Sequence, residues 1–225
     1  MPDILLTAYL VLLLPAYQLW RSLRRREAAS PQGAARFFRT ILIAASPMAA
    51  LVALWGAEGR SWIALGLGLG LAGAIGLVVA AVALAFMAVL VRRQMTAPGG
   101  PPKLPGGILP TTPQERRLAL ASGLLVGVAW ECLYRGYLLW FLAPRLGLLM
   151  AVLLAAAAYG VAHGYKDAKQ FSGSLVAALI FTVAYVLSHS LWWLMLIHAG
   201  LPALMVLAGA GLAPRVASAD SARPA

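Results

Sequence analysis

Long apolar stretches separated by short polar connections make up most of the chain. Runs of about 20 apolar residues are long enough to cross a bilayer as α-helices. The pattern predicts spans at residues 4–20, 40–55, 62–91, 113–141, 148–163, 171–187 and 191–207. A membrane barrel would instead require ten-residue segments of alternating polarity, which the sequence lacks. We therefore expect an all-α polytopic membrane protein, a bundle of about seven transmembrane helices.

The run at residues 62–91 is longer than one crossing needs. At 1.5 Å per residue it would extend about 45 Å as a helix, whereas the hydrocarbon core is about 30 Å thick. Gly66, Gly68 and Gly70 occupy alternate positions near its start, and glycines allow helices to approach closely. The run is therefore either one span or a re-entrant half-helix followed by a span.

A proline- and glycine-rich stretch at residues 94–112 forms the clearest break in the chain. Such a composition is typical of a linker. Thr112 and Glu115 then form a capping-box pattern, which predicts that a helix begins there. We divide the chain into N-terminal transmembrane helices with the linker (1–112), a four-helix core (113–212) and a disordered tail (213–225).

Composition and charge agree with a membrane protein. The chain is 62% hydrophobic and only 11% charged, against roughly 25% charged residues in soluble domains. Its net charge of +11 does not indicate a nucleic-acid partner, because the basic residues gather beside apolar runs, mainly at residues 21–39 and 92–117. Positive connections of this kind face the cytoplasm, so we expect the N-terminus outside and residues 94–112 inside. The single cysteine, Cys132, excludes an intramolecular disulfide.

Four ionisable side chains stand out because they lie inside apolar runs. Glu131 is the only one of the 7 acids in such a position, and Arg135 follows it by four residues, which places both on one helical face. His163 and His198 lie in later spans. Charged groups at membrane depth are costly and usually mark a site. We expect the four to assemble in an intramembrane polar cavity, while the other six acids lie in tails or polar connections.

Other interpretations of these residues remain open at this point. Glu131 and Arg135 could form a structural ion pair between helices. His163 could cap a helix end, and His198 could be bonded to a neighbouring helix. Glu131 and the two histidines could also hold zinc, so a divalent metal is not excluded, although no cofactor is expected.

The order and spacing of these residues resemble a known family over residues 129–203. The motifs are Trp130-Glu131-Cys132-Leu133-Tyr134-Arg135, Tyr159-Gly160-Val161-Ala162-His163 and His198-Ala199-Gly200-Leu201-Pro202. They resemble Glu-Glu-x-x-x-Arg, Phe-x-x-x-His and His-x-x-x-Asn/Asp of the CAAX-protease and bacteriocin-processing family of intramembrane glutamic endopeptidases. Trp130 stands where that family has its first glutamate, and Pro202 where it has its asparagine.

The resemblance implies an intramembrane endopeptidase that acts on a membrane or lipidated peptide, in the bacterial cytoplasmic membrane. In this chain Glu131 and His163 would activate water and His198 would be the oxyanion donor. Supporting residues would be Arg135, Tyr159 and Trp130. The alternative is a non-catalytic member that serves as a scaffold, immunity or substrate-binding protein in the bilayer. A transporter is a third interpretation, although no internal repeat is apparent.

Overall fold

The computed structural model describes residues 1–24, 33–96, 110 and 112–210, and every regular element in these ranges is helical. The α-helices are α1 (Pro2–Ala8), α2 (Leu14–Arg24), α3 (Ala34–Ala57), α4 (Leu71–Thr96), α5 (Pro113–Trp130), α6 (Leu138–Leu146), α7 (Leu148–Ala162), α8 (Ala168–Ser188) and α9 (Trp192–Ala210). Three π-helical segments are η1 (Tyr9–Leu13), η2 (Ile63–Leu67) and η3 (Glu131–Tyr137). The predicted all-α class is confirmed.

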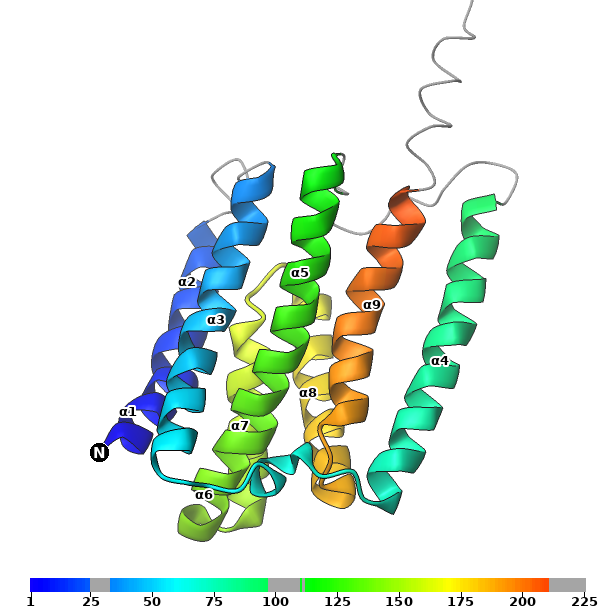
Figure 1. Ribbon diagram of the computed structural model, residues 1–225. Helices are drawn as coiled ribbons and strands as arrows, with labels where there is room; N and C mark the ends of the chain where they lie inside the picture. The colour runs from blue at the N-terminus through cyan, green and yellow to red at the C-terminus, as the bar shows by residue number, and fades with distance from the viewer. Residues whose placement is uncertain (25–32, 97–109, 111, 211–225) are drawn as a thin grey trace, which may run out of the picture.

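Among the described residues, five helical stretches are long and apolar enough to cross a membrane. They are Pro2–Arg24, Ala34–Ala57, Ile63–Gln94, Pro113–Leu146 and Ala168–Ser188. Two shorter apolar helices, Leu148–Ala162 and Trp192–Leu207, complete the bundle, whose helices stand side by side in Figure 1. The protein is therefore an integral, polytopic membrane protein, with segments where the apolar runs predicted them.

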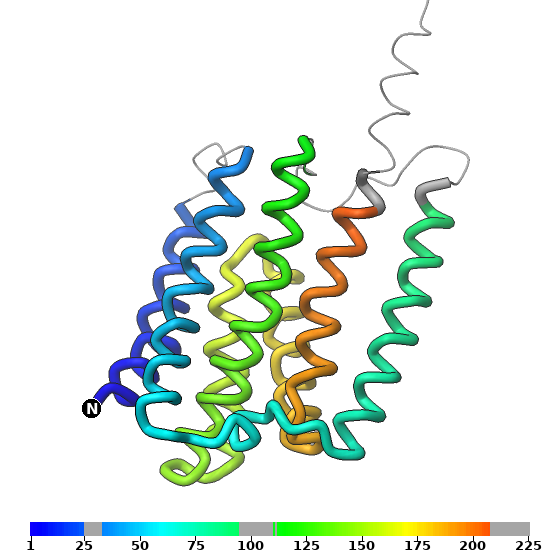
Figure 2. The backbone as a smooth tube through the Cα atoms, in the orientation of Figure 1, coloured from blue at the N-terminus to red at the C-terminus, as the bar shows by residue number. Residues whose placement is uncertain are grey.

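The long apolar run at residues 62–91 is divided into two elements. Its first part is η2, which crosses one end of the bundle between α3 and α4, as the cyan tube shows in Figure 2. Gly66 in η2 has a φ of 92°, a left-handed conformation that favours glycine. Gly68 is extended, and α4 then forms a 26-residue helix. Of the two predicted arrangements, the structure therefore has a short segment across the end of the bundle, followed by a single spanning helix.

The crossing segment η2 holds together the elements that carry the polar residues. Leu65 is fully buried, and its carbonyl accepts a hydrogen bond of 3.3 Å from the Tyr185 hydroxyl on α8. The Gly66 carbonyl accepts from the Leu191 amide at the start of α9, at 2.8 Å. A Cβ at Gly136 in η3 would lie only 2.6 Å from the Leu65 carbonyl oxygen. This end of the bundle is therefore closely packed around η2.

The lengths of α5 and α7 bring residues from different parts of the chain to one depth. The α5–η3–α6 stretch has 34 residues, so its start lies well before the middle of the bundle. It begins as predicted, because the Glu115 amide donates to the Thr112 hydroxyl at 3.1 Å. In contrast, α7 has 15 residues, about 22 Å, and its connection to α8 lies below the upper ends of α3, α5 and α9 in Figure 1. Its last turn therefore lies inside the bundle.

One acid lies in a different environment from the predicted one. Asp3 was expected in a polar tail, but it belongs to α1 and binds Arg60 with both carboxylate oxygens, at 2.8 and 2.7 Å. Arg60 also contacts Glu58 and lies 4.5 Å from the ring centre of Trp140. The hydrogen bond to Asp3 raises the pKa of the Arg60 guanidinium. The predicted linker and tail lie mostly or wholly outside the described residues, so their boundaries stay predictions.

Candidate functional site

The π-helical segment η3 places two charged side chains inside the bundle. Glu131 and Arg135 are 2% and 1% exposed. Nη1 of Arg135 donates to Oε2 of Glu131 at 2.6 Å and to Oε1 at 2.7 Å. A π-helical turn is wider than an α-helical one and often marks a functional position. The pair expected from the four-residue spacing is therefore present, and it is almost completely shielded from solvent.

His198 on α9 forms the third member of this group. Its Nδ1 lies 2.8 Å from Oε1 of Glu131 and 3.1 Å from the hydroxyl of Tyr159 on α7. A carboxylate can only accept hydrogen bonds, and the oxygens of Glu131 are paired with the Arg135 guanidinium. Nδ1 of His198 therefore carries a proton and donates it to Glu131. In a neutral ring, Nε2 of His198 is then an acceptor.

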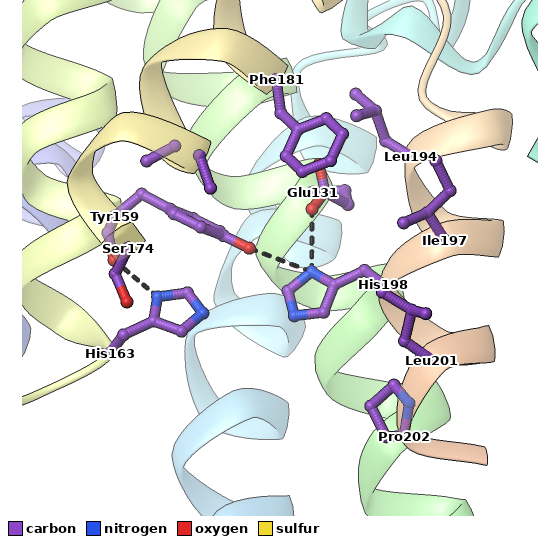
Figure 3. A pocket seen from close by; sticks show the side chains of 12 residues that line it. Glu131, Tyr159, His163, Ser174, Phe181, Leu194, Ile197, His198, Leu201 and Pro202 are labelled. Atoms are coloured by element: carbon purple, nitrogen blue, oxygen red, sulfur yellow. Dashed lines mark hydrogen bonds and ion pairs between the residues drawn. The ribbon is translucent and has the colours of Figure 1, made fainter. Parts of the chain in front are cut away.

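His163, at the end of α7, is held by the backbone of the same tyrosine. Its Nδ1 lies 2.9 Å from the Tyr159 carbonyl oxygen, which can only accept, so Nδ1 is the donor. Figure 3 shows the other ring nitrogen pointing toward His198. The centres of the two imidazole rings are 6.2 Å apart and their planes differ by 24°. Each neutral imidazole thus keeps one unprotonated nitrogen.

These side chains line one cavity of about 270 Å³ between α8 and α9. Its polar lining consists of Glu131, Tyr159, His163, Ser174 and His198. The apolar lining includes Phe181, Leu194, Ile197, Leu201 and Pro202. His163 is exposed at the open side, whereas Glu131 is buried. The structure therefore brings Glu131, His163 and His198 together, as the sequence predicted.

Trp130 lies beside the cavity and is not among its lining residues. It is 6% exposed, and its ring centre lies 5.2 Å from that of His163 and 5.7 Å from that of Tyr159. Both contacts are edge-to-face, a favourable arrangement for aromatic rings. The indole therefore packs against the rings of His163 and Tyr159 and does not line the cavity.

Arg135 and Tyr134 complete the packing around Tyr159. The guanidinium carbon of Arg135 lies 4.2 Å from the Tyr159 ring centre, within the range of a cation–π interaction. The Tyr134 hydroxyl donates to the Leu10 carbonyl of η1 at 3.2 Å, and its ring packs on Tyr159 at 5.5 Å. The Tyr159 side chain is thus fixed from several sides.

One residue that lines the cavity was not foreseen from the sequence. Ser174 on α8 lines the cavity and accepts a hydrogen bond of 2.8 Å from Gln170; a serine one helical turn after a glutamine was the only available signal. Zinc binding by Glu131 and the histidines finds no support, because the described residues contain no group of three or more His, Cys, Asp or Glu that could hold a metal ion.

Fold and site together define a helical membrane protein with a buried carboxylate–arginine pair and two imidazoles at one intramembrane cavity. Residues 113–204 match the family model of the type II CAAX prenyl endopeptidase Rce1-like. This match confirms the resemblance to the CAAX-protease family over the region that contains the whole site. Comparison with curated proteins and with solved structures gave no match.

Proposed function

We propose that the protein is an intramembrane endopeptidase of the bacterial cytoplasmic membrane that cleaves a membrane-embedded or lipidated peptide. Its family is one of CAAX prenyl endopeptidases. The observation that carries the proposal is the shared cavity of Glu131, His163 and His198. Two imidazoles with unprotonated nitrogens, held 6.2 Å apart between ring centres, can accept the two protons of one water molecule.

The hydrogen bonds support a different division of roles from the one that the resemblance implies. Both oxygens of Glu131 accept from Arg135, and one also accepts from His198. A carboxylate whose oxygens are occupied in this way is placed to orient the imidazole and to stabilise it once it is protonated, as in a carboxylate–histidine–nucleophile triad. We assign the general base to Nε2 of His198, and the positioning of the water to His163.

The reaction then follows from these positions. Nε2 of His198 takes a proton from water while the water oxygen bonds to the carbonyl carbon of the substrate. The carbonyl electron pair moves to its oxygen and gives a tetrahedral oxyanion. The imidazolium of His198 returns the proton to the peptide nitrogen as the carbon–nitrogen bond breaks. The products are a carboxylic acid and an amine, and Glu131 stabilises the imidazolium between the two proton transfers.

The lining of the cavity favours an apolar substrate segment. Phe181, Leu194 and Leu201 surround the polar group, and their side chains can bury apolar side chains of a peptide. The peptide must be unwound at the cleaved bond, because an intact helix hides its carbonyls in hydrogen bonds. We therefore expect a peptide partner that is held in the bilayer by its own apolar residues or by a lipid.

The test is proteolysis of a fluorogenic apolar peptide by the purified protein in lipid nanodiscs. His198→Ala should reduce kcat by about 10²- to 10⁴-fold, the usual contribution of a general base, and Glu131→Gln should also reduce it. His189→Asn is the matched control, because His189 has a φ of 47° at the end of α8 and asparagine tolerates this conformation. A wild-type protein that cleaves no member of a peptide library would refute the proposal.

A second candidate function is peptide binding without hydrolysis. It is favoured by Trp130, an indole where the family motif has a carboxylate and 5.2 Å from the ring of His163. The same assay separates the two functions when it includes a peptide with a photo-crosslinker. Crosslinking that depends on the cavity residues, without cleavage by the wild type, would establish the binding function.

A further inference from the structure

We propose that the hydroxyl of Tyr159 donates the hydrogen bond that stabilises the oxyanion during peptide hydrolysis. This assignment rests on the proposed function, because an oxyanion forms only if water attacks a peptide carbonyl. Hydrogen-bond donors directed at the developing negative charge are usually the largest catalytic term in acyl transfer. The donor must be preorganised, and its proton must be free in the resting site.

Few donors are available among the side chains that the structure places around the cavity. The Nδ1–H group of His198 is directed to Glu131, and that of His163 to a backbone carbonyl. Neither neutral ring has a second proton to donate. The remaining polar protons of the lining belong to the hydroxyls of Tyr159 and Ser174. The oxyanion donor is therefore one of these two.

Geometry favours Tyr159. Its oxygen lies 3.1 Å from Nδ1 of His198, and Nδ1 already carries the proton shared with Glu131. The tyrosine oxygen can only accept at that contact, so its own proton is directed elsewhere. In Figure 3 the hydroxyl lies over the space between the His163 and His198 rings, where the water and the carbonyl would meet. Ser174 lies beside His163, at the far side from His198.

The surroundings of Tyr159 also hold the donor in place. The Tyr159 ring centre lies 4.5 Å from the His163 ring centre. The guanidinium carbon of Arg135 lies 4.2 Å from the Tyr159 ring centre. The positive charge of Arg135 lies close enough to the Tyr159 ring to stabilise a nearby anion. A fixed donor needs no reorganisation when the charge develops.

The lining of α9 explains why a donor on α7 is needed. Pro202 faces the same cavity one helical turn after His198, and the motif of the family has an asparagine at this position. Proline has no side-chain donor. Tyr159 stands where the family motif has phenylalanine, so this chain has a hydroxyl at one wall of the cavity and lacks an amide at the other. An oxyanion donor on α7 in place of one on α9 would explain both the tyrosine at position 159 and the proline at position 202.

The experiment compares the kinetics of Tyr159→Phe with those of Ser174→Ala, which removes the other hydroxyl of the lining. Tyr159→Phe should reduce kcat by about 10²-fold or more, the usual effect of losing one oxyanion donor, with little change in KM. Ser174→Ala should reduce kcat by a smaller factor than Tyr159→Phe does. The double variant Tyr159→Phe with Pro202→Asn should recover at least tenfold of the lost kcat, because it supplies an amide donor to the same space.

Each outcome decides between the role of Tyr159 and the function as a whole. A cleaving wild type with an unchanged kcat in Tyr159→Phe overturns the role of Tyr159 alone, as does a larger loss in Ser174→Ala. Absence of cleavage by the wild type overturns both. If Tyr159→Phe lowers the melting temperature strongly, Tyr159→3-fluorotyrosine keeps the shape and makes the donor more acidic. A kcat equal to that of the wild type in that variant then overturns the assignment.

Discussion

At the scale of single residues, the buried Glu131–Arg135 pair explains how a carboxylate can stay in an apolar bundle. Transfer of a charge from water to a low-dielectric interior is costly unless it is paired and hydrogen-bonded. Glu131 has both: Arg135 Nη1 contacts its two oxygens, and His198 donates to one of them. The pair therefore fixes the carboxylate, and the carboxylate in turn fixes the orientation of the His198 ring.

The replacement Arg135→Leu should destabilise the fold by about 3–5 kcal/mol, because it leaves one buried charge without its partner. Thermal unfolding in detergent measures the loss. Adding Glu131→Gln should recover part of the stability, since the uncompensated charge is removed, but should restore no proteolysis. If Arg135→Leu unfolds at the wild-type temperature, the pair contributes nothing to the stability of the bundle.

At the scale of elements, the position of α9 depends on close contacts with its neighbours. A Cβ at Gly127 of α5 would lie 2.8 Å from the backbone nitrogen of Ala199, the residue after His198. On the other side of α9, a Cβ at Gly76 of α4 would lie 2.9 Å from the Trp193 ring. Small residues allow helices to pack this closely in a membrane. The distance between His198 and Glu131 is therefore set by the absence of a side chain at Gly127.

The replacement Gly127→Ala should push α9 away from α5 and lengthen the bond between Glu131 and His198. We expect a loss of about 1–3 kcal/mol from overpacking and a large loss of proteolysis. Gly173→Ala in α8 is the matched control, because a Cβ there meets nothing within 4 Å and alanine favours the helix. Equal melting temperatures and activities of the two variants would contradict the argument.

At the scale of the whole molecule, the connections lie alternately at the two ends of the bundle. The N-terminus and the α3–η2 connection share one end, where Asp3 binds Arg60. The beginning of α5 lies at the opposite end (Figure 1). The described basic residues near these helix ends, among them Arg24, Arg36, Arg93 and Arg116, lie toward that opposite end, and the positive-inside rule predicts that this end faces the cytoplasm. We therefore expect the side of the cavity at the exposed His163 to face the cytoplasmic half of the membrane.

Labelling of single cysteines in intact cells tests this orientation. Replacement of the only native cysteine, Cys132→Ala, gives a background without thiols. Gly100→Cys should resist a membrane-impermeant maleimide, because we expect residues 94–112 inside. Ser61→Cys, at the exposed α3–η2 connection, should react. The reverse labelling pattern would show that the protein has the opposite orientation in the membrane.

The sequence by itself determined the class of protein and most members of the site. The apolar runs predict the helix positions directly. A segment that crosses the bilayer must be helical and must present apolar side chains to the lipid. Glu131, Arg135, His163 and His198 could be identified because ionisable residues are rare in such runs. The helix start at Thr112 could also be predicted, since capping depends on residues only three apart.

Only the tertiary structure decided how these residues are used. The sequence could not choose between one span and two elements at residues 62–91, because η2 is fixed by contacts with Tyr185 and Leu191 far along the chain. It could not pair Asp3 with Arg60, 57 positions apart. The convergence of Glu131 and Tyr159 on one nitrogen of His198 depends on how α7 and α9 are rotated and how closely α9 approaches α5. Such rotations arise from packing between helices, which no local pattern in the sequence records.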